Sequence, residues 1–209
     1  MKTIAISATL LVICAIFIAV GGLHSWEYNV SVQDVLYERV RFEEIEGQGK
    51  ISIGFVSDSA EINEMIFVGW LHRRADGSVL GGSLKEETTI GELSIPARTW
   101  VSFNLEGQLL SCHFPEEQTI QGHVCRGTGD GAKGPVVNFY PSGRLKFFFA
   151  PENCVIQDVD CAGGLFSGIG LHESGKLKSC TLSNSLTIDG TKYPSGTLLR
   201  LDEEGNPED

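Results

Sequence analysis

The chain is short of basic residues. Its 209 residues include 16 lysines and arginines against 27 aspartates and glutamates, so the formal net charge at pH 7 is −11. Proteins that bind nucleic acid or an anionic membrane surface neutralise phosphates with cationic side chains. This charge balance therefore predicts no nucleic-acid partner, and the acidic surface is explained by solubility outside the cytosol.

Helical periodicity is also missing. After the N-terminus no stretch carries a sustained apolar stripe at helical spacing, and the chain instead holds 25 glycines together with many threonine, serine and β-branched residues. Short apolar runs separated by polar turn-formers are typical of strands. We therefore predict an all-β fold.

A repeated pattern of glycine and isoleucine runs through the body of the chain. Five glycines are each followed by an aliphatic residue two positions later and by an isoleucine thirteen positions later, at intervals of 28, 30, 36 and 32 residues. We call Gly49, Gly77, Gly107, Gly143 and Gly175 the repeat glycines, and their isoleucines are Ile62, Ile90, Ile120, Ile156 and Ile188. A single hairpin is marginal in water, so such units must stack to bury their apolar positions. The pattern predicts an elongated array of about five stacked β-hairpin repeats of roughly 30 residues.

The repeats divide the chain into segments. The predicted repeat domain covers residues 49–205. Residues 22–48 alternate apolar and polar side chains, as expected of a degenerate N-terminal hairpin that caps the array. Residues 206–209 form an acidic tail, which we expect to be too short to pack.

The predicted hairpin tips resemble those of a known repeat family. The segment Phe139-Tyr-Pro-Ser-Gly-Arg-Leu-Lys-Phe147 is echoed by residues 172–178 and 193–197. These segments resemble the hairpin cores of MORN-type repeats of the bacterial variant class, although the interval here is longer than the ~23 residues of that family. The resemblance implies a ribbon of hairpins with a binding or scaffolding role, and it assigns no functional residue.

The N-terminus carries an export signal. Lys2 precedes a run without charge from Ile4 to Val20, which as a helix would span about 26 Å, slightly less than the ~30 Å hydrocarbon core. Residues 1–21 are therefore predicted to be either a cleaved signal peptide or an N-terminal membrane anchor. In both cases the repeat domain is exported, to the periplasm, to the outside of the cell or to a membrane surface, and it contacts a membrane only through an uncleaved N-terminus.

Five cysteines follow this segment: Cys112, Cys125, Cys154, Cys161 and Cys180. Outside the cytosol cysteines tend to form disulfides, and an odd number leaves at least one thiol unpaired or paired between chains. If each repeat adds a hairpin, local bridges are favoured, Cys154 with Cys161 and Cys112 with Cys125. If each repeat adds one coil of a solenoid, Cys125 and Cys161 come within bridging distance.

Two further patterns in the sequence have the composition of ligand sites. Cys112-His113 and His123-x-Cys125 have metal-ligand chemistry, but adjacent strand residues point to opposite faces, so we predict no metal. The glycine-rich stretch 126–134 lacks the Ser or Thr that a phosphate-binding P-loop places after its lysine. Since it falls in the longest interval, we interpret it as an insertion at a hairpin tip and as a candidate binding loop, with Arg126, Asp130 and Lys133 as its candidate binding residues.

No catalytic constellation stands out. The chain has no Gly-x-Ser-x-Gly elbow, and its paired glutamates lie in polar turns. We predict a non-catalytic exported or envelope-associated repeat protein that acts as a binding or scaffold module for a protein or glycan partner, without a cofactor. The alternative is a secreted enzyme whose site is built from the loops 126–134 and 161–168.

Overall fold

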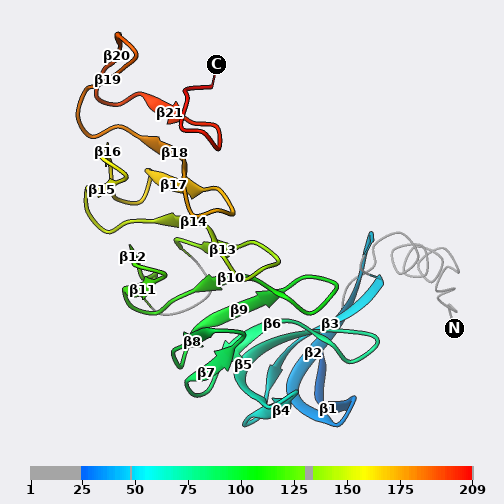
Figure 1. Ribbon diagram of the computed structural model, residues 1–209. Coiled ribbons are helices and arrows are strands. Elements are labelled where there is room, and N and C mark those ends of the chain that lie inside the picture. The colour runs from blue at the N-terminus through cyan, green and yellow to red at the C-terminus, as the bar shows by residue number, and fades with distance from the viewer. Residues whose placement is uncertain (1–24, 48, 130–133, 209) are drawn as a thin grey trace, which may run out of the picture.

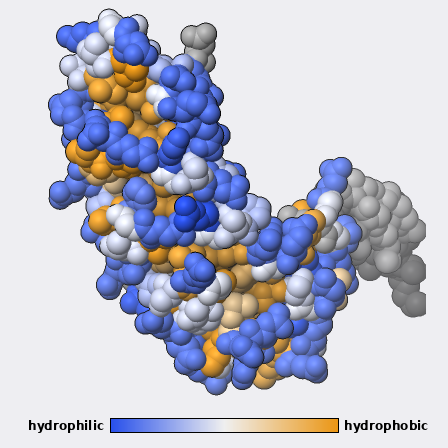
Figure 2. Space-filling model, viewed as in Figure 1, coloured by the Kyte–Doolittle hydropathy of each residue, from blue (hydrophilic) through white to orange (hydrophobic). Residues whose placement is uncertain are grey.

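The computed structural model describes residues 25–47, 49–129 and 134–208. Within these ranges the chain has 21 strands and no helix, which confirms the predicted all-β fold. The strands follow one another along an elongated, curved array with β1 to β6 at one end and β18 to β21 at the other (Figure 1). In the same view hydrophobic residues gather along the middle of the array, and hydrophilic residues cover its margins (Figure 2).

One large antiparallel sheet of 13 strands forms the body of the molecule. In hydrogen-bonding order its strands are β1 (Glu27–Val32), β2 (Val35–Ile45), β3 (Gly49–Val56), β5 (Met65–Arg74), β6 (Val79–Leu84), β9 (Trp100–Phe103), β10 (Leu109–His113), β13 (Val137–Phe139), β14 (Leu145–Phe149), β17 (Gly168–Leu171), β18 (Leu177–Thr181) and β21 (Leu198–Arg200), and β4 (Ala60–Ile62) pairs with β5.

Four small two-stranded sheets accompany the large sheet. They are β7 (Thr88–Ile90) with β8 (Leu93–Ile95), β11 (Gln118–Ile120) with β12 (His123–Cys125), β15 (Cys154–Ile156) with β16 (Val159–Cys161), and β19 (Leu186–Ile188) with β20 (Thr191–Tyr193). The chain leaves the large sheet after β6, β10, β14 and β18, makes one of these small hairpins and returns.

The five isoleucines of the sequence pattern take one structural position. Each is the last strand residue before a two-residue turn and pairs with the first residue after it, as Ile120 pairs with His123 and Ile156 with Val159; the other pairs are Ile62 with Met65, Ile90 with Leu93 and Ile188 with Thr191. In four of the turns both central residues have positive φ, as the type I′ turn requires. This common position explains why the interval to the repeat glycine is constant.

The repeat glycines lie at turns of a second kind. All five have positive φ, between 70° and 90°, where only a residue without a Cβ is unstrained. The N–H of Gly143 donates to the carbonyl of Tyr140 at 2.8 Å, and Gly107 and Gly175 make the same bond at 3.2 and 2.9 Å. These residues therefore close the tips of the hairpins β9–β10, β13–β14 and β17–β18.

One backbone hydrogen bond recurs at the base of all four small hairpins. The N–H groups of Arg98, Thr128, Gly164 and Gly196 each donate to the carbonyl fourteen residues earlier, at 2.8, 2.8, 2.9 and 2.8 Å. Because this closure is constant, the extra residues of the 36-residue interval must follow Thr128. They fall in the connection from β12 to β13. These two strands belong to different sheets, so the connection is not a hairpin and the interpretation of 126–134 as an insertion at a hairpin tip is wrong.

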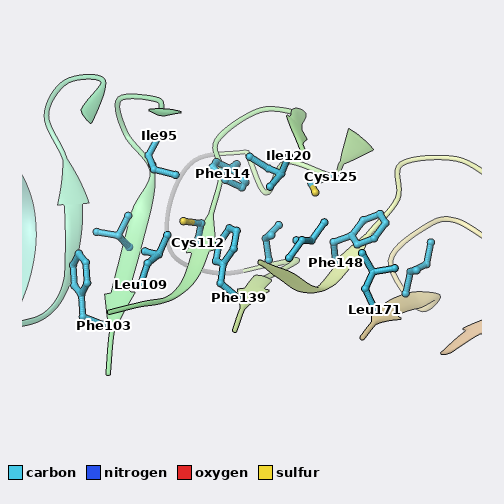
Figure 3. Close-up of a cluster of buried hydrophobic side chains, with 14 of the residues drawn as sticks. Ile95, Phe103, Leu109, Cys112, Phe114, Ile120, Cys125, Phe139, Phe148 and Leu171 are labelled. Atoms are coloured by element: carbon cyan, nitrogen blue, oxygen red, sulfur yellow. The ribbon is translucent and has the colours of Figure 1, made fainter. Parts of the chain in front are cut away.

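The core lies between the large sheet and the small hairpins. A row of inward-facing positions crosses the sheet, and its non-glycine members are at most 2 % exposed. The row is Val40, Gly54, Leu71, Gly82, Val101, Cys112, Val137, Phe148, Ile169, Cys180 and Leu199. Figure 3 shows Phe114 and Ile120 above this layer and Leu109 and Phe139 within it. The non-glycine residues named here belong to one continuous apolar cluster.

The two ends of the described chain are both paired. At one end, β1 and β2 form a hairpin whose second strand pairs with β3. At the other, the N–H of Glu208 donates to the carbonyl of Arg200 at 2.9 Å, and Pro207 forms an isolated backbone β-bridge with Leu201. The tail therefore packs against the last strand, contrary to the expectation that it would be too short to pack. The predicted signal or anchor, residues 1–21, lies outside the described residues; within them no helix has the length and hydrophobicity needed to span a membrane.

Candidate binding surface on the outer sheet face

The large sheet has a second face that points away from the core. Directly paired residues of neighbouring strands share a face, so the register of the strands defines one outward-facing row across the sheet. The row is Arg41, Ile53, His72, Gly81, Ser102, Ser111, Asn138, Phe147, Gly170, Ser179 and Arg200. Its two rings, His72 and Phe147, are each followed by a glycine on the next strand.

Aromatic side chains gather on this face. We define the aromatic face as Trp26, Phe55, Trp70, His72, Trp100, Phe147 and Phe149, all of them half-buried. Trp70 lies 5.9 Å from Trp26 and 5.7 Å from Phe55 between ring centroids, His72 lies 5.0 Å from Trp100, and Phe147 lies 5.1 Å from Phe149. These pairs are tilted or edge-on, the arrangements that aromatic quadrupoles favour. All three tryptophans of the chain are in the set.

Two arginines lie among the rings at the N-terminal end. The guanidinium carbon of Arg39 is 5.6, 5.9 and 5.1 Å from the centroids of Trp26, Phe55 and Trp70, and that of Arg41 is 5.0 Å from Trp26. These are cation–π distances. Arg41 also pairs with Glu43 at 2.7 Å, whereas no carboxylate of the described residues pairs with Arg39. The rings therefore hold the Arg39 guanidinium in place without neutralising it.

The face is hollowed beside Trp100. A depression of about 490 Å³ is lined by His72, Gly81, Trp100, Ser102 and Asn104, with the half-exposed Leu105 and Leu110 at its border. The indole N–H of Trp100 donates to the Ser102 hydroxyl at 3.1 Å, which fixes the ring plane. This volume falls in the range of small-ligand sites, about 300–1,000 Å³. The depression combines a fixed ring with hydroxyl, amide and imidazole groups.

Burial favours the neutral form of the imidazole in this depression. Burial lowers the pKa of His72 from its ordinary value of 6.5, and the nearby Glu43 carboxylate opposes part of this effect. A neutral imidazole has one donor and one acceptor nitrogen, so it can bond a hydroxyl in either sense.

The loop residues of the sequence prediction are only partly placed. Asp130 and Lys133 lie outside the described residues. Arg126 is half-buried, and its backbone N–H donates to the carbonyl of Phe149 at 2.7 Å. Its side chain borders a second hollow of about 490 Å³ that Glu116, Glu117 and Glu152 also line.

The two loops of the alternative enzyme site lie on either side of one segment. Arg126 bonds Phe149 from one side, and the N–H of Gly164 bonds the carbonyl of Ala150 from the other at 2.9 Å. The structure therefore brings the regions 126–129 and 161–168 close to residues 149–152. The described lining of the hollow near Arg126 contains glutamates, glycines, prolines and the arginine, and among these residues there is no Ser, Cys or His.

The cysteines are free thiols in this structure. Cys154 and Cys161 face each other across β15 and β16, as expected of a local pair. Cys112 and Cys125 are both fully buried, and burial raises the pKa of Cys125 to about 12 and that of Cys112 further. Cys161 instead forms its thiol hydrogen bond with Cys180, which neither local pairing included. Among the described residues no group of three or more His, Cys, Asp or Glu is placed to hold a metal ion.

Comparisons with protein-family models, with curated proteins and with solved structures found no match.

The aromatic face was missed in the sequence, although a signal for it exists. Strand positions that face solvent usually carry polar residues, yet Trp70 and His72 flank the buried Leu71, and Phe147 and Phe149 flank the buried Phe148. A core position with rings on both sides marks a strand whose two faces are both apolar. Such triplets point to a surface that binds.

Proposed function

We propose that the protein is a non-catalytic, exported binding module of stacked β-hairpin repeats, and that the aromatic face binds a glycan. The observation that carries the proposal is the row of half-exposed rings across one sheet face, interrupted by glycines and hydroxyl residues. Isolated apolar residues on a surface need no explanation, but three groups of paired rings on one sheet face do. About five repeats of roughly 30 residues are part of the same proposal.

The chemistry of the face suits a sugar chain. Aromatic rings offer flat apolar surfaces with a negative π face, on which the C–H groups of a sugar ring can stack. Ser102, Asn104 and the neutral His72 lie beside Trp100 and can exchange hydrogen bonds with hydroxyl groups. The unpaired guanidinium of Arg39 would add a site for a carboxylate or sulfate substituent.

The resemblance to MORN-type repeats and the predicted export signal support the same role. The resemblance implies binding or scaffolding without catalysis, and export places the repeat domain where glycans of the envelope are. N-terminal sequencing of the exported protein would separate a cleaved signal from a retained anchor.

The proposal is tested by tryptophan fluorescence, because all three tryptophans of the chain lie on the aromatic face. The full chain is titrated with soluble oligosaccharides derived from cellulose, chitin, xylan and uronic-acid polymers. We expect a saturable change with one of these classes. Trp100→Ala should weaken that binding about tenfold or more, equivalent to about 1.4 kcal/mol.

The matched control is Phe166→Ala. Phe166 is 97 % exposed on the connection between β16 and β17, so its loss removes an exposed ring that is not part of the aromatic face. Binding should be unchanged in this variant. If no oligosaccharide is bound but a captured envelope protein loses binding with Trp100→Ala, the face is a protein interface; if Trp100→Ala and Phe166→Ala behave alike with every partner, the face is not the binding site.

A secreted enzyme remains the second candidate. The observation that favours it is the hollow in which Arg126 meets Glu116, Glu117 and Glu152, between the loops that the sequence singled out. Hydrolysis of any oligosaccharide in the same titration, abolished by Glu152→Gln and not by Trp100→Ala, would support it.

A further inference from the structure

Matching positions of successive hairpins meet in a fixed way. Cys125 and Cys161 both lie eighteen positions after their repeat glycine, and Phe148 and Cys180 both lie five positions after the next one. The residue after Cys125 donates its N–H to the carbonyl after Phe148, and the residue after Cys161 does the same to the carbonyl after Cys180, each at 2.7 Å. The fold therefore places Cys125 beside Phe148 and Cys161 beside Cys180.

This rule selects one cysteine pair. Cys112 takes the same position as Phe148 and Cys180, and the residue at the matching place in the preceding hairpin is Ile95. Cysteine occurs on both sides of the contact only for Cys161 and Cys180. These two thiols are fully buried and hydrogen-bonded to each other. The backbone of Cys161 also forms an isolated β-bridge with that of Leu182, two residues beyond Cys180.

A third thiol reaches the pair from the surface. Cys154 pairs directly with Cys161 across the small hairpin, so both side chains point to one face of it. Cys154 is half-exposed and lines a hollow of about 470 Å³ together with His123, Phe148 and Glu152. A small molecule in this hollow can touch Cys154, whereas Cys161 and Cys180 lie behind it.

We propose that Cys161 and Cys180 form a disulfide that links the small hairpin β15–β16 to strand β18 of the large sheet, and that a small-molecule disulfide delivers the oxidation through Cys154. The pairing is independent of the glycan proposal, since it rests on other residues and another face.

Thiol–disulfide exchange accounts for every atom. The Cys154 thiolate attacks the small disulfide, forms a mixed disulfide and releases the first small thiol. Cys180 attacks the sulfur of Cys154 and releases the second small thiol. Cys161 then loses its proton to solvent and attacks the sulfur of Cys180, which returns Cys154 to a free thiolate. The protein loses two hydrogen atoms in total, and one small disulfide becomes two small thiols.

The exposure of Cys154, whose own pKa burial raises, assigns it the first step, and the acidities of the buried pair agree with the later steps. The hydrogen bond from Cys161 lowers the pKa of Cys180, which makes Cys180 the more acidic thiol of the pair, while the same bond raises the pKa of Cys161. A thiolate is the attacking species in exchange. Cys112 and Cys125 are fully buried, so a small disulfide does not reach them and these two thiols should stay reduced.

The experiment maps the product in the full chain. Reduced protein is incubated with oxidised glutathione, alkylated and digested without reductant, and the peptides are identified by mass spectrometry. We expect one linked pair that joins the peptides containing Cys161 and Cys180, and alkylation of Cys112, Cys125 and Cys154. A final product that links Cys112 to Cys125 or Cys154 to Cys161, or alkylation of all five thiols, would overturn the proposal.

Variants test the route. Cys154→Ser should slow oxidation at least tenfold and leave the linked pair unchanged, whereas the matched variant Cys112→Ser at a buried thiol should leave the rate unchanged. Oxidation should raise the Tm of the wild type and should not raise that of Cys161→Val. Peptide mapping of the wild type decides the pairing even if a variant does not fold, and equal rates for Cys154→Ser and wild type would refute the part given to Cys154.

Discussion

The phenyl ring of Phe147 on β14 lies over the backbone of Gly168 on β17, in the space that a Cβ at Gly168 would occupy. The ring also meets Phe149 edge-on at an interplanar angle of 89°. Glycine is thus required here for close approach, since Gly168 is not among the residues with positive φ. A Cβ at Gly81 would likewise meet the Trp100 ring, so glycines leave room for two of the rings on the outer face.

Gly168→Ala should therefore destabilise the protein by displacing the ring. We expect a loss of about 1–3 kcal/mol in the free energy of unfolding, the usual cost of overpacking, measured by denaturant titration. The double variant Phe147→Ala/Gly168→Ala serves as control, because it removes the ring that the new methyl group strikes. Its loss should be smaller than the sum of the two single losses, and additive losses would show that the contact is not the cause.

Gly163→Ala should be more damaging than Gly168→Ala. A Cβ at Gly163 would strike the backbone of Glu152, and Gly127 approaches the backbone of Glu116 in the same way. A ring can rotate away, but a backbone carbonyl held in a sheet connection moves only with its neighbours. The unfolding midpoints of Gly163→Ala and Gly168→Ala in the same denaturant, with Ser167→Ala as the control, would test this ranking.

The isoleucine position gives a test of the stacking. Ile120 is 4 % exposed in the middle of the array, and Ile188 is half-buried in the last small hairpin. Ile120→Ala should cost about 2–5 kcal/mol, as for other buried isoleucines. Ile188→Ala should cost about half as much, because it has a neighbouring hairpin on one side only. Equal losses of thermal stability would contradict a core that depends on neighbours at both sides.

The sequence predicts the local geometry well for a physical reason. Gly107 and Ile120 are specified by backbone needs that act over a few residues, a positive φ at one tip and a paired apolar residue before a turn. Constraints of this kind recur wherever the same hairpin recurs. The interval between them therefore appears in the sequence as a period.

Contacts between successive hairpins are harder to predict. The contact of Cys161 with Cys180 depends on which position of one hairpin meets which position of the next. The spacing of the cysteines in the sequence favours the local partner Cys154 instead. The position of the extra residues after Thr128 has the same cause, since only the hydrogen bond to Phe114 shows where the small hairpin closes. The aromatic face was hidden because its rings are spread over four strands, β3, β5, β9 and β14, and over Trp26 before β1.

Acidification should destabilise the fold well above the pH at which carboxylates titrate. Burial lowers the pKa of His72, His113 and His123 below their ordinary value of 6.5. Each imidazole binds a proton less readily in the folded chain than in the unfolded one, so protonation favours unfolding. Their contribution is fully present above pH 6.5 and is lost as the pH falls from there through the lower pKa values of the folded state.

The Tm should therefore fall between pH 7.5 and pH 5, and the triple variant His72→Gln/His113→Gln/His123→Gln should show a smaller fall over the same range. Asp76 and Asp202 have pKa values below 3.8 because Ser78 and Asn206 donate hydrogen bonds to them, so their contributions change only at lower pH and do not disturb this window. His172→Gln is the matched control, since its ring bonds the carbonyl of Leu201 at 2.8 Å outside the aromatic face. A wild-type Tm that is constant from pH 7.5 to pH 5 would show that the three imidazoles are not held neutral by burial.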